Sequence, residues 1–235
     1  MKKCVLFTAI AVGAMMVSCN KASETTEPEK EAIEATASSE MAALRTADAL
    51  AKYGYEAESA SALIEAANIL ASTPTQTFEA EDFFAGENNV TGDKKESQEH
   101  VTPTKLITDA KALTDDATLL AMAAKVEEKI AAADAEGTRG AVGGPRSGYG
   151  TVYAGDYTMY DVKFFANSLA EVLVSGDGDT DLDLFVYDGN GNLITSDTDY
   201  TDDCYVRFIP YYTTVFHIKI VNRGRVYNNY AIATN

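Results

Sequence analysis

A short acidic segment in the second half of the chain holds the residues best suited to chemistry. In "DTDLDLFVYD", Asp179, Asp181 and Asp183 alternate with residues of other types. A β-strand has a side-chain period of two, so we expect the three carboxylates on one face and the leucines facing inward. Ca²⁺ takes roughly six to eight oxygen ligands. Carboxylates on such a strand and in the loop that follows it are suitable donors.

The spacing excludes an EF-hand loop and leaves two interpretations. Counted from Asp177, the sixth position is Leu182, where the EF-hand requires Gly, and the twelfth is Asp188, where it requires Glu. The first interpretation is a calcium site of another kind, and the second is an acidic face in water with turn-forming aspartates. The candidate calcium ligands are Asp179, Asp181, Asp183, Asp199, Asp202 and Asp203.

Nucleophilic catalysis has little support in the sequence. Cys204 lies in the alternating segment "CYVRF", where we expect a buried residue that behaves as a small apolar side chain. His217 lies between Phe216 and Ile218, so its ring is expected on the side opposite the core. The chain has only two histidines and no G-x-S-x-G motif. We therefore expect no enzymatic activity.

The N-terminal residues indicate export and lipidation. Two lysines precede an apolar run over residues 4–17, which has the length of a signal-peptide core and is too short for a relaxed membrane span. The motif "MVSC" resembles a bacterial lipobox. This resemblance implies a signal peptide over residues 1–18, a lipid anchor on Cys19 and, because Asn20 is not Asp, a place in the outer membrane.

The charge of the chain limits its partners. Lys and Arg number 19 against 36 Asp and Glu, and the net charge is −17. Nucleic acids and anionic lipid surfaces select basic patches, so a nucleic-acid partner is not expected. Membrane contact is expected through the lipid on Cys19. The sequence leaves open whether the partner is a protein or a glycan.

Residues 39–136 have helical periodicity and follow a polar segment, residues 19–38, that is expected to be a disordered tether. "SEMAALRTADALAKYGY" and "ESASALIEAANILAST" predict a helical hairpin, in which Gly54 ends the first helix and Ser59 caps the second. Residues 73–102 are polar and are expected to form an exposed loop before a second helical pair.

A weak internal repeat links the two helical pairs. "LIEAANIL" begins at residue 63 and "LITDAKAL" at residue 106, and both follow the pattern Leu-Ile-x-x-Ala-x-x-Leu. This pattern resembles tetratricopeptide-type hairpins, although the spacing exceeds their usual repeat of about 34 residues. A repeat scaffold and a plain four-helix bundle both remain open.

The composition changes after a Gly-rich linker, expected over residues 137–149. Val, Ile, Thr and aromatic residues become frequent, and seven short runs are separated by turn residues. This pattern predicts an antiparallel, jelly-roll-like β-sandwich over residues 150–235. The tyrosines in this part are candidates for protein or glycan contact, with core packing as the alternative. They are Tyr153, Tyr157, Tyr160, Tyr205, Tyr211, Tyr212, Tyr227 and Tyr230.

Residues 150–235 also resemble a known family. The acidic segment "SGDGDTDLDLFVYDGNGN", the strand "VFHIKIVN" and the closing "YNNYAIAT" are similar to the bacterial pre-peptidase C-terminal domain. The resemblance implies a non-catalytic β-sandwich that acts as an appended binding, secretion or stability module, and some members bind calcium. We therefore expect a non-enzymatic cell-envelope lipoprotein with a binding or structural module. The alternative is an accessory factor or inhibitor of a secreted peptidase.

Overall fold

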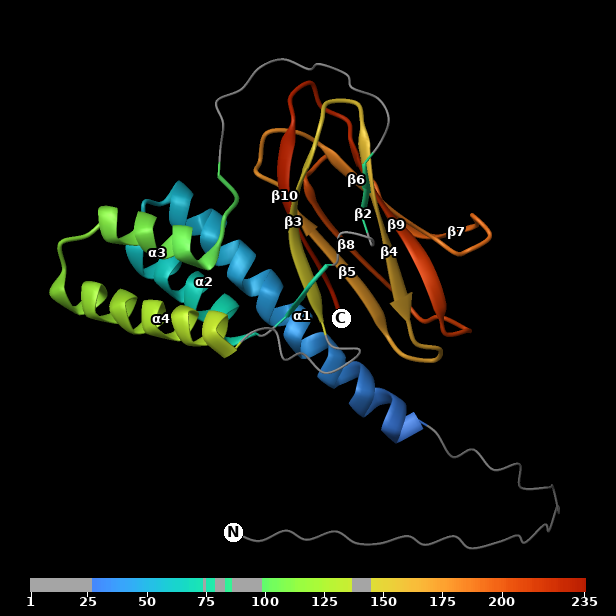
Figure 1. The fold of residues 1–235 in the computed structure, drawn as a ribbon, viewed down its shortest axis with the longest axis horizontal. Coiled ribbons are helices and arrows are strands. Elements are labelled where there is room, and N and C mark those ends of the chain that lie inside the picture. The colour runs from blue at the N-terminus through green and yellow to red at the C-terminus, as the bar shows by residue number, and fades with distance from the viewer. Residues whose placement is uncertain (1–26, 74, 79–82, 86–98, 137–144) are drawn as a thin grey trace, which may run out of the picture.

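The computed structural model describes residues 27–73, 75–78, 83–85, 99–136 and 145–235. Figure 1 shows the helices beside a β-sandwich, with α1 running along the sandwich. The helices are α1 (Glu27–Glu56), α2 (Ala60–Ser72), α3 (Pro103–Ala112) and α4 (Ala117–Glu136). Within the described ranges, no helix is long and apolar enough to cross a bilayer. The predicted signal peptide and Cys19 lie outside the described residues.

Side chains cap the N-termini of α2, α3 and α4. The backbone N–H of Ala62 donates to Ser59 Oγ at the start of α2, as predicted. Thr102 caps α3 by accepting from the backbone N–H of Lys105, and a proline occupies the first turn. At α4, Asp116 Oδ1 accepts from two backbone N–H groups at 2.7 and 3.0 Å.

Gly54 does not end the first helix, contrary to the prediction. It lies buried within α1, which continues to Glu56. A Cβ at Gly54 would be 2.5 Å from Cδ2 of Leu63 on α2. The glycine therefore allows α1 and α2 to approach closely, and the turn comes later, where Glu58 has a φ of 49°.

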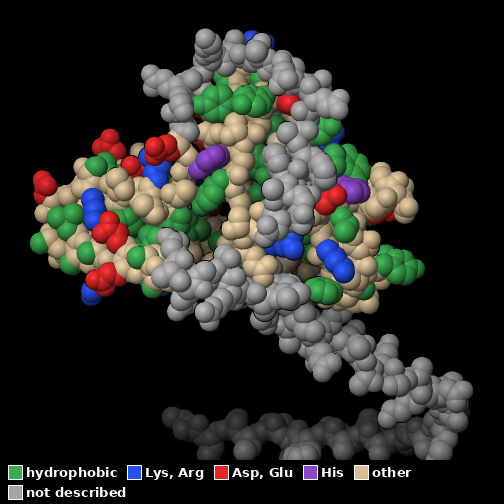
Figure 2. Space-filling model, in the orientation of Figure 1, with side chains coloured by type: hydrophobic (Ala, Val, Ile, Leu, Met, Phe, Trp, Pro, Cys, Tyr) green, Lys and Arg blue, Asp and Glu red, His purple; other side chains and the backbone are tan. Residues whose placement is uncertain are grey.

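The helical bundle is built around α2, which packs against the other three helices. Leu63, Ile64, Leu106 and Ile107 are almost completely buried in its core, among many alanines. Small side chains let the helix axes come close together, so the alanine-rich sequence suits a compact bundle. Acidic and basic side chains are interspersed over the outer surface of these helices (Figure 2). The resemblance to tetratricopeptide hairpins stays a prediction.

The second part is a β-sandwich, as predicted. Sheet A has the order β1-β3-β10-β5-β8 and sheet B the order β2-β4-β9-β6-β7. All pairings are antiparallel except that of β1 with β3. The strands are β1 (Gln76–Thr77), β2 (Phe83–Ala85), β3 (Arg146–Val152), β4 (Tyr157–Phe164), β5 (Ala170–Ser175), β6 (Leu182–Tyr187), β7 (Leu193–Asp197), β8 (Asp203–Phe208), β9 (Thr214–Asn222) and β10 (Asn228–Thr234).

The sandwich core follows the alternation of the sequence. Leu182, Leu184 and Val186 on β6 have no exposed surface and pack with Ile218 and Ile220 of β9. Polar groups in this core are paired with each other. The Tyr230 hydroxyl lies 2.7 Å from Thr158 Oγ1 and 2.8 Å from the Tyr160 hydroxyl.

Residues 76–78 and 83–85, between the two helical pairs, belong to the sandwich, which corrects the prediction of an exposed loop over residues 73–102 for these described residues. β1 adds an edge strand to sheet A, and β2 adds one to sheet B. Phe78, between them in the chain, packs against the core with its ring 5.0 Å from that of Tyr160. Strands of two and three residues are too short to show a side-chain period, so the sequence pattern could not reveal them.

Two further boundaries differ from the expected ones. α1 begins at Glu27, inside the segment predicted as a tether, because residues 27–38 are rich in the helix formers Glu and Ala even though they lack an apolar stripe. β3 begins at Arg146, inside the predicted linker, where hydrogen bonding to β10 overrides the local glycine content.

The helices and the sandwich share an interface between α1 and the outer face of sheet A. Met41 is completely buried there, and Leu44 is 7% exposed, beside Leu173 and Ala233 of the sheet. Polar contacts lie along the same helix. The Arg45 guanidinium is 4.2 Å from the centre of the Tyr205 ring.

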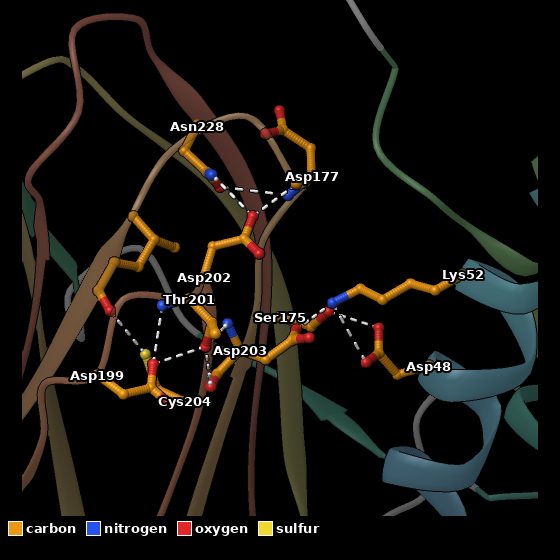
Figure 3. A network of polar contacts seen from close by, with 12 residues as sticks. Asp48, Lys52, Ser175, Asp177, Asp199, Thr201, Asp202, Asp203, Cys204 and Asn228 are labelled. Carbon is orange, nitrogen blue, oxygen red and sulfur yellow. Dashed lines mark hydrogen bonds and ion pairs between the residues drawn. The ribbon is translucent and has the colours of Figure 1, made fainter. Parts of the chain in front are cut away.

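Four further side chains extend this interface toward the C-terminal end of α1 (Figure 3). Ser175 Oγ donates to Asp48 Oδ1 at 2.5 Å, and Lys52 forms an ion pair with Asp203 of β8. Burial raises the pKa of Asp48. Burial alone would lower the pKa of Lys52, but the neighbouring Asp48 and Asp203 carboxylates outweigh it and raise that pKa. Because α1 is tied to sheet A by both apolar and polar contacts, it covers part of that face.

Candidate functional site

The acidic segment does not form the predicted row of three carboxylates. β6 begins at Leu182, so Asp183 is the only one of the three that lies in a regular strand. The chain before it turns, with Gly178 at a φ of 87°. Asp183 is also not in water. It is 7% exposed, and Arg223 Nε donates to its Oδ2 at 2.6 Å.

The other two aspartates of the segment, which precede β6, differ from each other in exposure. Asp179 is exposed, whereas Asp181 is partly buried. Burial and the nearby carboxylates of Asp183 and Asp199 raise the pKa of Asp181. The backbone carbonyl of Asp181 accepts from the N–H of Arg223, which ties this turn to the end of β9.

Asp202 organises the turn that precedes β6. Its Oδ2 accepts from the backbone N–H of Gly178 at 2.5 Å and from Asn228 Nδ2 at 3.1 Å. Asn228 is completely buried, and its Oδ1 accepts from the backbone N–H of Asp177. Figure 3 shows these groups pointing toward one another. Asp202 and Asn228 therefore hold the 176–180 turn against the end of β10.

The other two loop aspartates have separate roles. Asp199 accepts from the backbone N–H and the hydroxyl of Thr201 at 2.8 and 2.7 Å, and these bonds lower its pKa. Asp203 pairs with Lys52 of α1. In the described part of the chain, no three His, Cys, Asp or Glu side chains form a group that could hold a metal ion. The calcium site therefore stays a prediction without a ligand cluster in this structure.

Cys204 and His217 lie on different sheets. Cys204 is buried on β8 of sheet A, and its thiol donates to the Leu182 carbonyl at 3.1 Å. Burial and nearby carboxylates raise its pKa far above the usual range of a thiol, which disfavours the reactive thiolate. His217 lies on β9 of sheet B, where its Nδ1 is 2.6 Å from Asp161 Oδ1. The histidine is paired with a carboxylate, not with the cysteine.

The predicted tyrosine face is divided among several environments. Tyr160 and Tyr230 are core residues, and Tyr205 lies against α1. Tyr211 and Tyr212 are exposed in one loop. Of the eight candidate tyrosines, only Tyr157 belongs to the sheet face described next.

The outer face of sheet B carries the best candidate site. Strand register places Asp161, His217 and Tyr187 side by side in one row. The neighbouring row contains Met159, Lys219 and Phe185. We call these six residues, together with Tyr157, the sheet B face. Figure 2 shows hydrophobic, basic, acidic and histidine side chains close together over this part of the sandwich.

The aromatic rings of the sheet B face are ordered by their neighbours. Phe185 and Tyr187 are stacked, with ring centres 6.3 Å apart and an interplanar angle of 23°. Lys219 Nζ lies 4.1 Å from the centre of the Tyr157 ring. All three rings are partly exposed. The sequence named only Tyr157, because Phe185 and Tyr187 alternate with core residues in an apolar run that hides which face they share.

Comparisons with known proteins give only distant likenesses. No known family model matches the chain, and no curated protein matches it. One similar solved structure is the pre-peptidase C-terminal domain of a Bacillus anthracis collagenase, with 8% identity over 38% of this chain and 87% of that one, at a TM-score of 0.32. The β-sandwich implied by the sequence resemblance is present here, whereas membership of that family is not shown.

Two other similar structures are binding or inhibitor proteins. PliG from Aeromonas hydrophila, a periplasmic inhibitor of g-type lysozyme, has 12% identity over 39% of this chain and 84% of that one, at a TM-score of 0.31. The carbohydrate-binding module CBM36, solved with calcium and xylotriose, has 18% identity over 38% of this chain and 86% of that one, at a TM-score of 0.27. Similarities this low indicate no ligand or activity for this chain.

Proposed function

We propose that this chain is a non-enzymatic cell-envelope lipoprotein, anchored through Cys19, whose β-sandwich binds a ligand on the sheet B face. The observation that carries this proposal is the pair of adjacent rows on that face. They combine stacked aromatic rings with the Asp161–His217 pair and with Lys219. Aromatic bodies beside fixed polar groups provide contact area and orientation together.

A glycan of the envelope fits this face best. The partly exposed rings of Tyr157, Phe185 and Tyr187 can contact the C–H groups of a sugar. The carboxylate, imidazole and ammonium groups can pair with sugar hydroxyl and amide groups. The net charge of −17 opposes binding of strongly anionic polymers. We therefore propose a ligand that is close to neutral, such as the glycan strands of peptidoglycan.

Co-sedimentation with insoluble peptidoglycan tests the ligand. The unlipidated chain, residues 20–235, contains every described element. Tyr187→Ser removes one ring of the stacked pair, and we expect binding about tenfold weaker, equivalent to roughly 1.4 kcal/mol. Tyr200→Ser is the matched control, because Tyr200 is 97% exposed in the β7–β8 connection, outside the face. Equal sedimentation of both variants and the parent would refute binding on the sheet B face, provided that circular dichroism shows the same fold.

The peptidase-accessory alternative has a distinct outcome. It requires that the chain bind or inhibit a secreted peptidase, and that Tyr187→Ser weaken this effect while peptidoglycan does not bind at all. No contact in the described residues favours it over a glycan.

The anchor is tested in cells. Cys19→Ala should move the protein from the membrane fraction to the soluble fraction, because the acyl chains supply the membrane affinity. Unchanged membrane association together with an unmodified cysteine in the parent protein would refute lipidation.

A further inference from the structure

One end of the sandwich exposes an unusual number of large apolar side chains. The β4–β5 connection (165–169) and the β8–β9 connection (209–213) lie at this end, which we call the loop end. Its exposed side chains are Phe165 (52%), Ile209 (40%), Tyr211 (87%) and Tyr212 (80%). A cluster of this kind marks an interaction surface more often than an isolated exposed residue does.

The loop end is held in one shape by bonds between its two connections. The backbone N–H of Asn167 donates to the carbonyl of Pro210 at 2.8 Å, and the N–H of Ala166 donates to Thr213 Oγ1 at 2.9 Å. Asn167 has a φ of 58°, which turns the first connection toward the second. The exposed rings therefore sit on a preformed support.

The loop end also differs from the rest of the chain in charge. Residues 162–170 and 205–215 contain no Asp or Glu, although the chain has 36 of them. Exposed Lys163 and Arg207 lie within these two segments. The opposite end of the sandwich carries the "DTDYTDD" connection. The two connections that carry the exposed apolar residues are thus free of acidic side chains. Asp188 of the β6–β7 connection, next to Gly189 and Val215, lies toward the same end.

The direction of α1 brings the start of the described chain to the same end. Met41 packs at the level of Leu173, and Asp48 bonds to Ser175, so α1 runs in the same direction as β5. Lys52 reaches Asp203 at the start of β8, whereas Arg45 lies on Tyr205, further along that strand. Following α1 backwards therefore leads toward the start of β5 and the end of β8, which is the loop end.

The lengths agree with this direction. The 14 residues from Glu27 to Met41 span about 21 Å of helix. The three residues from Ala170 to Leu173 span about 10 Å of strand. α1 therefore starts at or beyond the level of the loop tips, and Figure 1 shows both on the same side of the molecule. Cys19 lies eight residues before Glu27, a reach of at most about 28 Å.

We propose that the loop end docks on the lipid bilayer, with Phe165, Tyr211 and Tyr212 at the level of the head groups. The proposal rests on the proposed lipid anchor for the approach to the membrane. Tyrosine suits this position because its ring is apolar and its hydroxyl stays hydrated. The start of α1 contains Glu27, Glu29 and Glu31, so interfacial burial of the rings supplies the attraction, not charge.

Docking would fix the orientation of the protein. A lipid at the end of a tether leaves a protein free to rotate, whereas a second contact restricts rotation. With the loop end on the bilayer, the strands stand away from the membrane and the sheet B face is turned sideways, open to ligands beside the protein.

The chain contains no tryptophan, so a single introduced tryptophan can report the docking through its fluorescence. Tyr211→Trp places the probe at the loop end, and Tyr200→Trp places the matched control at the opposite end, at a residue that is 97% exposed. Residues 20–235 with an N-terminal hexahistidine tag are bound to phosphatidylcholine vesicles that contain nickel-chelating lipid. The tag replaces the acyl anchor, so the test does not depend on lipidation of Cys19.

We expect the tryptophan emission of the Tyr211→Trp variant to shift to shorter wavelength and to be quenched by brominated phosphatidylcholine, while the emission of the Tyr200→Trp variant stays unchanged. Adding Phe165→Ser, Ile209→Ser and Tyr212→Ser to the Tyr211→Trp variant should abolish the shift.

The inference is overturned if the Tyr211→Trp and Tyr200→Trp variants respond alike. It is also overturned if the Tyr211→Trp variant responds to soluble peptidoglycan fragments and not to vesicles. Neither outcome would bear on peptidoglycan binding or on lipidation of Cys19, because these two proposals are tested by separate experiments.

Discussion

Replacement of Asp202 by alanine tests whether the acidic segment is a hydrogen-bonded structural feature. Asp202 is 7% exposed, and its Oδ2 accepts from the Gly178 N–H and from Asn228 Nδ2. Asp202→Ala removes both acceptor bonds. The Gly178 N–H and one N–H of the completely buried Asn228 then lose their partner. The Asn228 amide keeps its bond to Thr180 Oγ1 at 3.0 Å.

The size of the effect follows from those two bonds. Hydrogen bonds to a charged acceptor contribute about 1.5–3 kcal/mol, and each buried donor left without a partner costs about 1–3 kcal/mol. Water reaches part of this turn, so we expect a total loss of about 3 kcal/mol in the free energy of unfolding. For a chain of this length, that corresponds to a melting temperature lower by roughly 6–12 °C.

The assay is thermal and urea unfolding of residues 20–235, followed by circular dichroism, in chelator and in millimolar calcium. Asp199→Ala is the control from the same connection. Asp199 is exposed and bonds to Thr201 of its own turn, so its replacement should leave the melting temperature unchanged. The loss for Asp202→Ala should be the same in both solutions.

Two results would refute this reasoning. Asp202→Ala with the stability of the parent would show that the two bonds contribute nothing. A parent protein stabilised by calcium, with an Asp202→Ala loss that disappears in chelator, would show that a cation holds the acidic segment. That outcome would support the predicted calcium site in place of the hydrogen-bonded turn.

Three other predictions concern the core, the interface and the thiol. Phe78→Ala should destabilise the chain by about 2–3 kcal/mol in urea unfolding, because the ring packs on Tyr160 and the sandwich core; an unchanged midpoint would mean that the inter-helix segment does not close the sandwich. Met41→Ala should cost about 2–4 kcal/mol, because this side chain is completely buried between α1 and sheet A; a loss below about 0.5 kcal/mol would argue against that interface. Cys204 is the only thiol in residues 20–235, and burial raises its pKa. It should therefore not react with a thiol reagent at pH 8 until urea unfolds the chain. Rapid labelling of the folded protein would contradict its burial.

Local sequence patterns were sufficient where one element determines the structure. The Ser59 cap depends on neighbouring residues alone, and it is present. The burial of Leu182 and Leu184 follows from strand alternation, and both are fully buried. The patterns failed where a partner distant in sequence decides the outcome. The sequence around Gly54 predicts the end of a helix, and only the contact with Leu63 on α2 shows that the glycine allows close helix packing instead.

The candidate sites show the same division. Asp183 alternates like a solvent-facing residue, but Arg223, 40 residues later in the chain, covers it. Phe185 and Tyr187 read as part of an apolar run, and only the pairing of β6 with β9 shows that they lie beside Lys219 and His217. No spacing within one segment encodes these neighbours.

Side-chain periodicity and turn residues are local properties, so they were enough to predict a helical part followed by a β-sandwich. The acid-free composition of residues 162–170 and 205–215 is also read directly from the sequence. The tertiary structure was needed to show that these two segments meet at one end, that α1 leads back to that end, and that Asp183, Asp199, Asp202 and Asp203 take separate partners. Strand pairing and helix docking join residues far apart in sequence, and these contacts are set by the packing of the whole chain.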